Sequence, residues 1–519
     1  MVEHRSFGVQ AVRLELVRFR DGRGRIDENR FVVPRHGEGQ ARDVVHPARN
    51  RENGDRQQAQ KHVGKPGHGV GRVWGSFEKG EHTGRGASVQ RKCAVIPGLM
   101  GGRISGREGG MQWVLAISIA LLAYVYAGYP ALIGLWARFR PRPVRKGPFA
   151  GGVAVLIAAH DEAGTLPRKL EQLLELAQAE PIREIWIGLD GCTDGTGERV
   201  RDRLETLDQR LETGNQWQGG GDPSLQSPPR IQILEFESRR GKAAVLNDLM
   251  ARATQPILVL MDARQRVEAG AISRLLENFA DEQVGAVSGE LVYEAADGAA
   301  QKGAESYWGY EKFIRQSESR TWAVPGATGA LYAIRRDLCE PIPENTLVDD
   351  VLIPMRAVLQ GYRCLFEPAA RVFDLPSARF GQEGLRKRRT LAGIWQLAVL
   401  EPRFFSFRAN PIAFQWYSHK FLRLLTPFFV LAGLFSLVGM SFEGQKAAQG
   451  WLGAAGIAIL ASFLAFLGGK RVKSRILGLF GAFFGVNWAL LQAAGDAARG
   501  RYVARWQKSD PGHDSRTAG

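Results

Sequence analysis

The sequence predicts an α/β domain on a parallel sheet, anchored in a membrane by about four transmembrane helices. Three observations predict this fold class. Strand-length apolar runs alternate with helical patterns between residues 150 and 400. Uncharged stretches long enough to cross a bilayer flank this region on both sides. Of the 519 residues, 45% are apolar and 24% are charged, an ordinary globular composition that excludes a fibrous or wholly disordered chain.

Residues 1–110 differ from the rest of the chain. They hold 21 Lys and Arg against 12 Asp and Glu, and their apolar residues keep no helical or alternating period. Such a segment buries too little apolar surface to offset its ordering entropy, so we expect a disordered basic leader. A basic arm for nucleic acid or anionic lipid is one alternative. Another is that the leader is a mis-called start, because Met111 directly precedes an apolar run.

The first transmembrane helix is expected at 111–137, within 29 consecutive uncharged positions. About 20 apolar residues suffice to cross a bilayer. The run is too long, and lacks an obvious cleavage site, for a typical signal peptide. Five basic residues follow at once, so the positive-inside rule places the following domain in the cytosol. They are Arg138, Arg140, Arg142, Arg145 and Lys146.

The domain, residues 150–400, begins with a continuous apolar run, as expected for a strand buried on both faces. Strands and helices then alternate, which predicts right-handed crossovers and a parallel sheet that binds ligands at the carboxyl ends of its strands. The expected strands are 152–159, 185–189, 231–236 and 257–261, and the expected helices are 166–179, 197–211 and 242–253.

Polar and acidic residues stand at three of these strand ends. A purely structural sheet has no need of carboxylates at successive strand ends, so the pattern predicts a binding site there. The residues are His160 and Glu162 after the first strand, Asp190 after the second and Asp262 after the fourth.

Beyond the domain, residues 404–420 mix aromatic and basic side chains and predict an interfacial helix. Three more transmembrane helices are expected within 424–497, followed by a basic tail, 498–519. Four crossings would put this tail on the side opposite the domain, against the positive-inside rule. Either one stretch does not span the membrane or the tail breaks the rule.

Seven short motifs follow one another in the domain. They are AAHDEAGTL (158–166), LDGCTDGT (189–196), RRGKAAVLN (239–247), MDARQ (261–265), GATGALYAIRRD (326–337), VDDVLIPMRAVLQGYRCLFEP (348–368) and RKRRT (386–390). Together they resemble the membrane-bound family 2 glycosyltransferases of the GT-A (Rossmann-like) fold, relatives of the hyaluronan, cellulose and poly-N-acetylglucosamine synthases. The resemblance covers about residues 111–500. It implies an inverting hexosyltransferase that moves a sugar from a nucleotide-diphosphate sugar to a saccharide or lipid-linked acceptor, in polysaccharide or glycoconjugate synthesis.

The resemblance also implies a donor pocket at the sheet edge. It assigns Ala159, His160 and Glu162 to the base and ribose, Asp190 to a hydrogen bond with the base, and Lys242 and Asn247 to a segment beside the donor. Helix N-capping is the alternative role for Glu162 and for Asp194.

Asp262 begins the position of the family's DxD motif, whose carboxylates hold Mg²⁺ or Mn²⁺ against the diphosphate. The second acidic position is Arg264 here. A guanidinium cannot ligate a metal, but it can pair with phosphate. The metal is therefore expected at Asp262 with help from elsewhere, or Arg264 partly replaces it. The four cysteines include no CxxC pair, which disfavours a zinc site.

On the acceptor side, Gly326, Gly329 and Ala330 match a small-residue loop that lets a sugar approach the backbone; a plain turn is the alternative. Asp349 and Asp350 occupy the family's Glu-Asp position. Asp350 is the expected general base with Asp349 beside it, and two close carboxylates should raise one pKa. Capping of a helix at 351–359 is the alternative for both.

The family's QxxRW motif falls at Arg386, Arg389 and Thr390, so only the Arg of that motif is kept. Arg388 and Arg389 are candidates for binding the diphosphate; a basic helix face on anionic lipid is the alternative. Loss of the Trp removes a surface on which a sugar could stack. Addition of one or a few sugars therefore fits as well as long-chain synthesis.

We therefore expect an integral protein of the cell (inner) membrane with a cytoplasmic catalytic domain, in contact with membrane lipid and without a nucleic-acid partner. A polyprenyl-phosphate glycosyltransferase is the alternative within the same class. A basic, membrane-tethered nucleic-acid-binding protein and a transporter without catalysis are alternatives of other classes. The first of these leaves the strand-end carboxylates unexplained.

Overall fold

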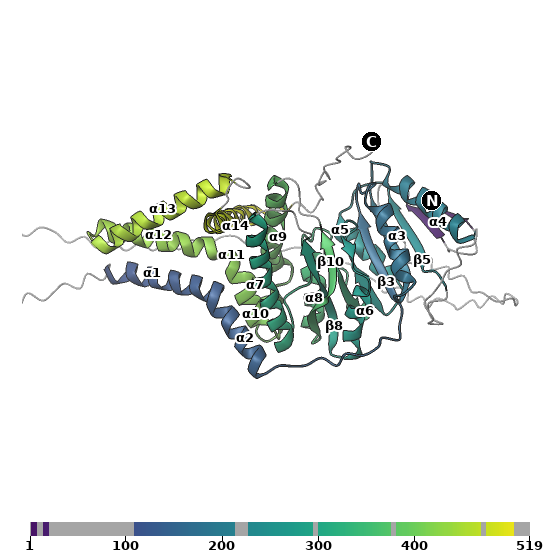
Figure 1. The fold of residues 1–519 in the computed structure, drawn as a ribbon, viewed down its shortest axis with the longest axis horizontal. Coiled ribbons are helices and arrows are strands. Elements are labelled where there is room, and N and C mark those ends of the chain that lie inside the picture. Colours follow the sequence, from purple (N-terminus) through teal and green to yellow (C-terminus); the bar gives the residue numbers. More distant parts are fainter. Residues whose placement is uncertain are drawn as a thin grey trace, which may run out of the picture. The chain divides into compact units, whose positions relative to one another are not determined.

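The computed structural model of the chain describes residues 2–7, 14–19, 108–212, 227–293, 299–374, 380–468 and 474–502, all within one compact unit. Its strands form one sheet in the order β1-β2-β5-β4-β3-β6-β9-β8-β10-β7 (Figure 1). The strands are β1 Val2–Phe7, β2 Leu14–Phe19, β3 Val153–Ala159, β4 Ile182–Asp190, β5 Arg230–Phe236, β6 Ile257–Leu260, β7 Arg266–Val267, β8 Val284–Tyr293, β9 Tyr332–Arg335 and β10 Arg363–Asp374.

Helices cover both faces of this sheet. Along β3, Val153, Val155 and Ile157 pack with α3, α4 and α6 on one face, while Ala154 and Leu156 pack with α5, α8 and α9 on the other. Burial on both faces explains why β3 is a continuous apolar run. These helices are α3 Leu166–Ala177, α4 Thr196–Glu212, α5 Lys242–Arg252, α6 Ala271–Leu276, α8 Asp349–Leu359 and α9 Phe380–Leu400; α7, Ala299–Thr321, follows β8.

The four predicted strands are confirmed as β3, β4, β5 and β6, and the three predicted helices as α3, α4 and α5. The predicted parallel arrangement holds for these four strands. Beyond β6 the sheet is mixed, because β9 runs antiparallel to both β6 and β8. Mixed sheets of this kind are common among large α/β domains.

The expectation of a disordered leader is wrong for two short segments. β1 and β2 pair antiparallel, and β2 pairs parallel with β5. The physical reason is the unpaired edge of β5, whose backbone groups accept an added strand. The rest of 1–107 lies outside the described residues.

Among the described residues, three helical segments are long and apolar enough to cross a membrane, and a fourth exists if a bent pair counts as one span. The first, Gly110–Phe139, comprises α1 Glu108–Ala123, a π-helical turn at Tyr124–Gly128 and α2 Tyr129–Phe139. The others are α13 Lys446–Gly468 and α14 Arg475–Ala498. The bent pair joins Ala413–Leu424 to α12, Thr426–Phe442, at 58°. These helices expose large apolar side chains, as lipid contact requires.

The predicted interfacial helix at 404–420 is not a single helix. A 3₁₀ turn covers Pro402–Phe405, and helix resumes only at α10, Ala413–Gln415, which continues through a π-helical segment, Trp416–Phe421, into α11, Leu422–Leu424. Asn410, buried between them, donates to the Phe404 carbonyl oxygen and accepts from the Ile412 N–H. Phe404 and Trp416 lie in the domain core rather than on a membrane surface. Their aromatic character therefore reflects packing against α8 and α9.

Candidate active site

Three predicted site positions lie at the ends of adjacent strands. β4, β3 and β6 are neighbours in the sheet, so Asp190, His160 and Asp262 meet at one edge of it. The alternation of strands and helices in the sequence is what brings them together, because the carboxyl ends of parallel strands share an edge.

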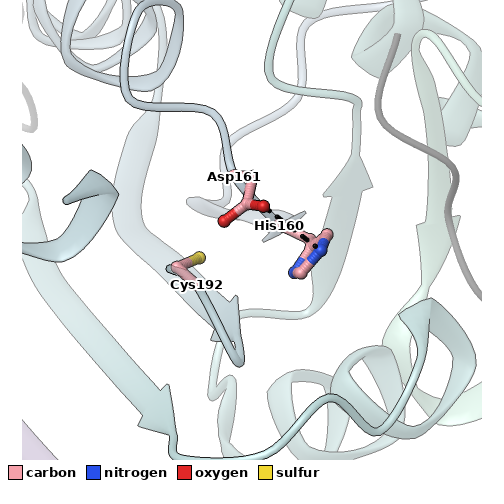
Figure 2. Close-up of side chains that lie close together, drawn as sticks. All are labelled: His160, Asp161 and Cys192. Atoms are coloured by element: carbon pink, nitrogen blue, oxygen red, sulfur yellow. Dashed lines mark ion pairs between the residues drawn. The ribbon is translucent and has the colours of Figure 1, made fainter. Parts of the chain in front are cut away.

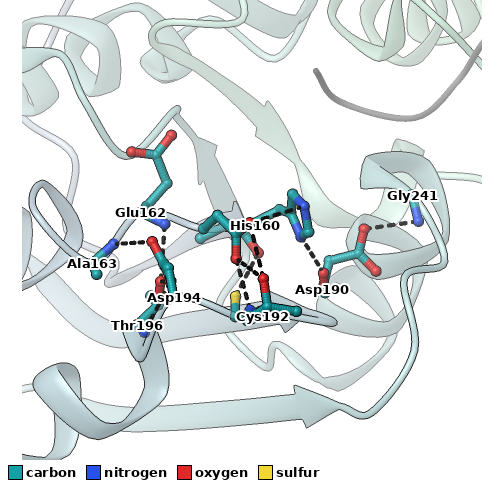
Figure 3. Close-up of polar contacts among 11 residues, drawn as sticks. His160, Glu162, Ala163, Asp190, Cys192, Asp194, Thr196 and Gly241 are labelled. Carbon is teal, nitrogen blue, oxygen red and sulfur yellow. Dashed lines mark hydrogen bonds and ion pairs between the residues drawn. The ribbon is translucent and has the colours of Figure 1, made fainter. Parts of the chain in front are cut away.

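Polar contacts join the loop after β3 to the loop after β4 (Figure 3). The backbone N–H groups of Glu162 and Ala163 donate to Thr196 Oγ1 at 2.9 Å and to Asp194 Oδ2 at 3.2 Å. Asp194 Oδ1 also accepts from the Thr196 N–H at 3.1 Å, where α4 begins. Asp194 therefore has the capping role that the sequence left open. We call these two loops, residues 160–163 and 192–196, the strap.

Glu162 points away from the backbone groups it could cap. Its carboxylate accepts from the Thr165 hydroxyl. Burial raises the pKa of Glu162, and the hydrogen bond from Thr165 and the charge of Arg264 oppose that rise. A half-buried carboxylate at the strand end suits a polar ligand such as a ribose.

His160, Asp161 and Cys192 bring three potential metal-binding atoms within 4.8 Å of one another (Figure 2). Each already has a partner. His160 Nδ1 lies 2.7 Å from the Asp190 carbonyl oxygen, and Asp161 Oδ1 accepts from the Thr193 N–H at 2.7 Å. Burial raises the pKa of the Cys192 thiol to about 11. The contacts of His160 and Asp161 help to shape the strap.

Two residues assigned to the donor by resemblance have other partners. Asp190, fully buried, accepts from the N–H groups of Arg240 (2.6 Å) and Gly241 (2.8 Å), one at each carboxylate oxygen. It thus fixes the loop before α5. Asn247 exchanges two hydrogen bonds with the backbone of Ile342.

Ala159 likewise differs from its assignment, because its side chain lies in the core between the sheet and α3.

Lys242, the first residue of α5, lies between two carboxylates. Its Nζ is 3.1 Å from Asp262 Oδ1 and 3.3 Å from Asp349 Oδ2. Burial alone would lower the pKa of Lys242, but the charges of Asp262, Asp349 and Asp350 raise it well above its ordinary value. The lysine is therefore a permanent cation. We call Lys242 with these three aspartates the acidic cluster.

Asp350 lies beside Asp349 in the first turn of α8. Burial, with the charge of Asp349, raises its pKa to about 6, against the opposing charge of Lys242. Its Oδ2 accepts from the Gly329 N–H at 2.9 Å. A carboxylate with a pKa near neutrality, held at a glycine loop, is suited to accept a proton.

The two aspartates do not cap α8. Neither side chain caps the helix, whose N-cap residue, Val348, also makes no side-chain cap. They lie in the first turn, where the helix dipole favours negative charge. The capping alternative raised by the sequence is therefore wrong for the described geometry.

The small-residue loop is built around α8. Gly326 has φ of 116°, a conformation that favours glycine. A Cβ on Gly329 would lie 3.3 Å from Asp350 Oδ2, so the glycine permits close approach of this carboxylate. Ala330 is buried in the core. The loop thus holds the Asp350 carboxylate directly.

Arg264 pairs with a residue that the sequence did not reveal. Its guanidinium lies 3.2 Å from Asp374 Oδ2, at the end of β10, and Gln265 donates to the same oxygen. Asp262, whose side chain is 38% exposed, keeps one carboxylate oxygen clear of Lys242. The residues present can thus offer one open carboxylate to a divalent metal, and the rest of its coordination must come from substrate and water, as is usual for Mg²⁺.

Arg388 and Arg389 differ in their partners. Arg388 makes a bidentate ion pair with Asp496 of α14, with both N–O distances 2.6 Å. The charge of Arg388 is therefore paired in this structure. Arg389 Nε is buried without a hydrogen-bond partner in the described part of the chain. Arg386 is half-buried and Thr390 exposed on the same helix.

Lys169 was also missed by sequence reasoning. It lies on α3, is almost fully buried and donates to the Gln265 carbonyl oxygen at 2.5 Å. Burial lowers its pKa to about 7, although the charge of Asp262 opposes this. A lysine one turn into an amphipathic helix looks like a solvated residue, so only its position beneath the Asp262 loop identifies it.

Comparisons with known proteins match this arrangement. A profile described as Glycosyl transferase family 2 matches residues 154–342, and one described as Glycosyl transferase family group 2 matches residues 257–468. Among solved structures, the chain is similar to the mannosyltransferase PcManGT from Pyrobaculum calidifontis, with a TM-score of 0.54 and 22% identity. That match covers 74% of this chain and 99% of the other.

Two curated relatives are also similar. Poly-beta-1,6-N-acetyl-D-glucosamine synthase of Staphylococcus aureus is 24% identical over 260 residues, 49% of this chain and 57% of the relative. Beta-monoglucosyldiacylglycerol synthase of Nostoc sp. is 24% identical over 295 residues, 52% of this chain and 58% of the relative. The chain spans just over half the length of these relatives.

The mixed sheet, with the acidic cluster at its edge, has the GT-A fold. Two overlapping family profiles cover this domain and continue into the apolar helices. The chain carries a glycosyl transferase family 2 domain, and its apolar helices fit a membrane-associated protein.

Proposed function

We propose that this protein transfers a hexosyl group from a nucleotide-diphosphate sugar to a hydroxyl of a saccharide or lipid-linked acceptor, with inversion at the anomeric carbon. One observation supports this most strongly: Asp350, whose pKa is raised to about 6, is held against the glycine loop and beside Lys242. In a direct displacement, the acceptor hydroxyl loses its proton to a carboxylate while the diphosphate leaves. Asp350 is the base, and burial together with the charge of Asp349 keeps its pKa high.

Because the acidic cluster is negatively charged, we infer that a cation is needed for the donor diphosphate to bind. Three carboxylates face one lysine, so the cluster is anionic before any substrate binds. A diphosphate adds further negative charge and needs positive charge to approach. Arg389 and the partly exposed Arg264, which lie in the motifs of the sequence, are the protein's candidates for supplying this positive charge.

In this proposal, a divalent cation supplies the remaining positive charge. The mannosyltransferase structure similar to this chain was solved with GDP-Man and Mn²⁺. Asp262 would hold the metal through its open oxygen, together with the diphosphate. A bound metal supplies charge neutralisation of the leaving diphosphate.

The proposal is tested by offering purified full-length protein a panel of nucleotide sugars and measuring release of nucleoside diphosphate. Release with one donor, dependent on an added acceptor and absent in Asp350→Asn, supports it. Product stereochemistry, read from the anomeric proton couplings, tests inversion. Release that is equal in Asp350→Asn would remove the base from the proposal.

The acceptor class follows from a second measurement. One relative is named as a polysaccharide synthase and another as a glycolipid synthase. A labelled product that partitions into organic solvent indicates a lipid acceptor, including the polyprenyl-phosphate alternative. A product that stays in water indicates a saccharide. The exposed Thr390, in place of the family's Trp, favours short products.

We also propose that the catalytic domain is cytoplasmic and that α14 lies along the membrane surface. Its C-terminal part packs on the domain: Leu490 joins the domain core, Ala493 contacts Leu347, and Asp496 pairs with Arg388. Figure 1 shows α14 nearly end-on beside α9. If α14 does not cross, three crossings leave the basic tail on the domain side, as the positive-inside rule requires.

A reporter protein that fluoresces only in the cytosol, fused after residue 519, tests this topology. Fluorescence from intact bacterial cells agrees with a cytosolic tail. A dark fusion, with activity from a reporter that works only outside the cytosol, would show that α14 crosses.

A further inference from the structure

A cavity of about 460 Å³ lies away from the acidic cluster, where α2 leaves its candidate membrane span. It is formed by three segments: the end of α2 with the residues after it, the end of α7, and the turn that leads into α10. Its lining includes Trp136, Arg140, Arg142, Trp322, Pro411 and Gln415. Neither the strap nor any motif residue lines it.

The cavity is positively charged. Among the described residues, neither Arg140 nor Arg142 forms an ion pair with a carboxylate, and both are exposed. The Arg142 guanidinium stacks 4.7 Å from the centre of the Trp322 ring. A buried third cation, Arg363, stacks on the same ring and donates to the carbonyl oxygens of Arg142 and Trp322. Arg363 therefore fixes the geometry, while the first two arginines keep donors for a ligand.

Two more polar groups of the lining have no hydrogen-bond partner in the described part of the chain. Trp322 Nε1 is buried and unpaired. Gln415 is only 3% exposed, yet its side-chain amide makes no hydrogen bond there. Buried donors without partners are uncommon, because each one costs free energy. The buried Trp322 Nε1 and the Gln415 amide, beside two arginines that pair with no carboxylate, form a site for an anion with several acceptor oxygens.

The position of the cavity relative to the membrane indicates the source of that anion. Trp136 belongs to the span Gly110–Phe139, and Arg140 and Arg142 follow its last turn. Tryptophan at a membrane interface, followed directly by arginine, lies at the level of lipid headgroups. Phe139, which is 75% exposed, continues the apolar surface up to the cavity.

We propose that this cavity binds the phosphodiester of an anionic phospholipid from the leaflet that faces the catalytic domain. Arg140 and Arg142 pair with the phosphate, Trp322 Nε1 and Gln415 donate to its oxygens, and Trp136 contacts the glycerol and upper acyl chain. The shared chemistry is that of a phosphate, and the position at the end of α2 assigns it to a lipid. The proposal does not depend on the sugar transferred.

The test uses full-length protein in neutral detergent, with phosphatidylglycerol, phosphatidylcholine or inorganic phosphate added. Bound lipid is counted by native mass spectrometry and the melting temperature is recorded. The wild type should retain phosphatidylglycerol and melt at a higher temperature with it, because a ligand that binds only the folded state stabilises it. Arg140→Gln with Arg142→Gln should retain at least about tenfold less, which is about 1.4 kcal/mol of binding free energy.

The matched control is Arg138→Gln with Arg145→Gln. It removes the same charge from the same basic run but outside the cavity lining. It should bind lipid like the wild type, which separates a built site from general attraction of the basic run. A second variant, Trp322→Phe, keeps a ring under Arg142 but removes the Nε1 donor, and should retain severalfold less lipid.

Three results would overturn the proposal. The first is equal retention by the Arg140/Arg142 variant and its control. The second is equal retention of phosphatidylcholine, which would make the site indifferent to net charge. The third is a melting shift produced by inorganic phosphate alone, which would assign the cavity to a soluble anion.

Discussion

The strap and the acidic cluster use the same residue types in opposite ways. In and beside the strap, carboxylates accept hydrogen bonds from the chain itself: Asp194 from Thr196, and Asp190 from two backbone N–H groups. In the acidic cluster, three carboxylates share one lysine, and burial raises the pKa of Asp350 to about 6.

The difference separates shape from chemistry. A carboxylate whose oxygens are satisfied by backbone donors fixes a loop and has little capacity left for a substrate. A carboxylate that is buried with like charges has a perturbed pKa and can exchange a proton near neutral pH. In the proposed function, the strap therefore shapes the nucleotide side of the edge, and the acidic cluster performs the transfer.

Asp350→Asn should have the largest effect on activity. Asn keeps the size and can still accept from the Gly329 N–H, but it cannot take the acceptor proton. Removal of a general base costs about 10²–10⁴-fold in rate, and about 10³-fold corresponds to about 4 kcal/mol. Donor binding, measured by calorimetry, should stay near normal. Turnover within a few-fold of wild type at saturating substrates would make Asp350 a structural residue like those of the strap.

Lys242→Gln should have the next largest effect. It removes the cation that offsets three carboxylates, so the pKa of Asp350 rises further and the base is protonated at pH 7. Transfer at pH 7 should fall at least about tenfold, because each pH unit below the pKa of a base reduces its active fraction tenfold. Raising the pH to 9 should restore part of the rate. A loss that is independent of pH would assign Lys242 to the diphosphate instead.

The pH dependence of the wild type provides a milder test. Asp350 is active when deprotonated, so kcat/KM should rise with pH through about 6 and then level off. Asp349→Asn removes the neighbouring charge that helps to raise this pKa. The rising limb of the kcat/KM profile should therefore move to lower pH. Burial is the larger cause, so the limb should stay above the ordinary range of an aspartate. An unmoved limb would mean that Asp349 and Asp350 do not interact.

Asp190→Asn should change stability more than chemistry. An amide has one acceptor oxygen, so one of the two backbone N–H groups would face an NH₂ group. Leaving a buried donor unsatisfied costs about 1–3 kcal/mol, and the melting temperature should fall accordingly. Thr196→Val, on the strap, is the matched control for loss of a polar side chain. A large loss of donor affinity with unchanged melting temperature would return Asp190 to the nucleotide base.

The sequence predicts this fold well because the relevant patterns are local. Continuous apolar runs at β3 and β6 and helical periods at α3 and α5 depend on nearby residues alone. The mixed half of the sheet was not predicted, because the pairing of β9 with β6 joins segments that are far apart in the chain. The strands at the N-terminus depend on an open edge at β5, which no local pattern reveals.

In the candidate site, too, some residues could be predicted from the sequence and others could not. The residue type at a strand end predicted Asp262, the family resemblance implied Asp349 and Asp350, and the structure brings Lys242 among them. The roles of Asp190 and Asn247 could not be predicted, because an acceptor for a backbone N–H and a ligand for a base use the same side chain. Asp374 and Lys169 contact the Asp262–Gln265 loop from distant elements, and no spacing in the sequence signals that.

Arg388 and its neighbour Arg389 offer the finest test of the comparison, because they are adjacent on one helix. Arg388 behaves like a strap residue: its charge is paired with Asp496. Arg388→Gln should therefore leave transfer within about threefold of wild type. The pair is partly exposed, so its loss should cost at most about 1 kcal/mol of stability.

Arg389→Gln is the matched change of the same charge. Arg389 Nε has no partner in the described residues, so this variant should raise the KM for the nucleotide sugar about tenfold and leave the melting temperature unchanged. The exchanged pair Arg388→Asp with Asp496→Arg should restore the stability lost in Arg388→Gln, because it recreates the contact between α9 and α14 with its charges reversed. If Arg388→Gln impairs donor binding more than Arg389→Gln does, the ion pair with Asp496 must open during the reaction, and the division between satisfied and available charge would not hold on this helix.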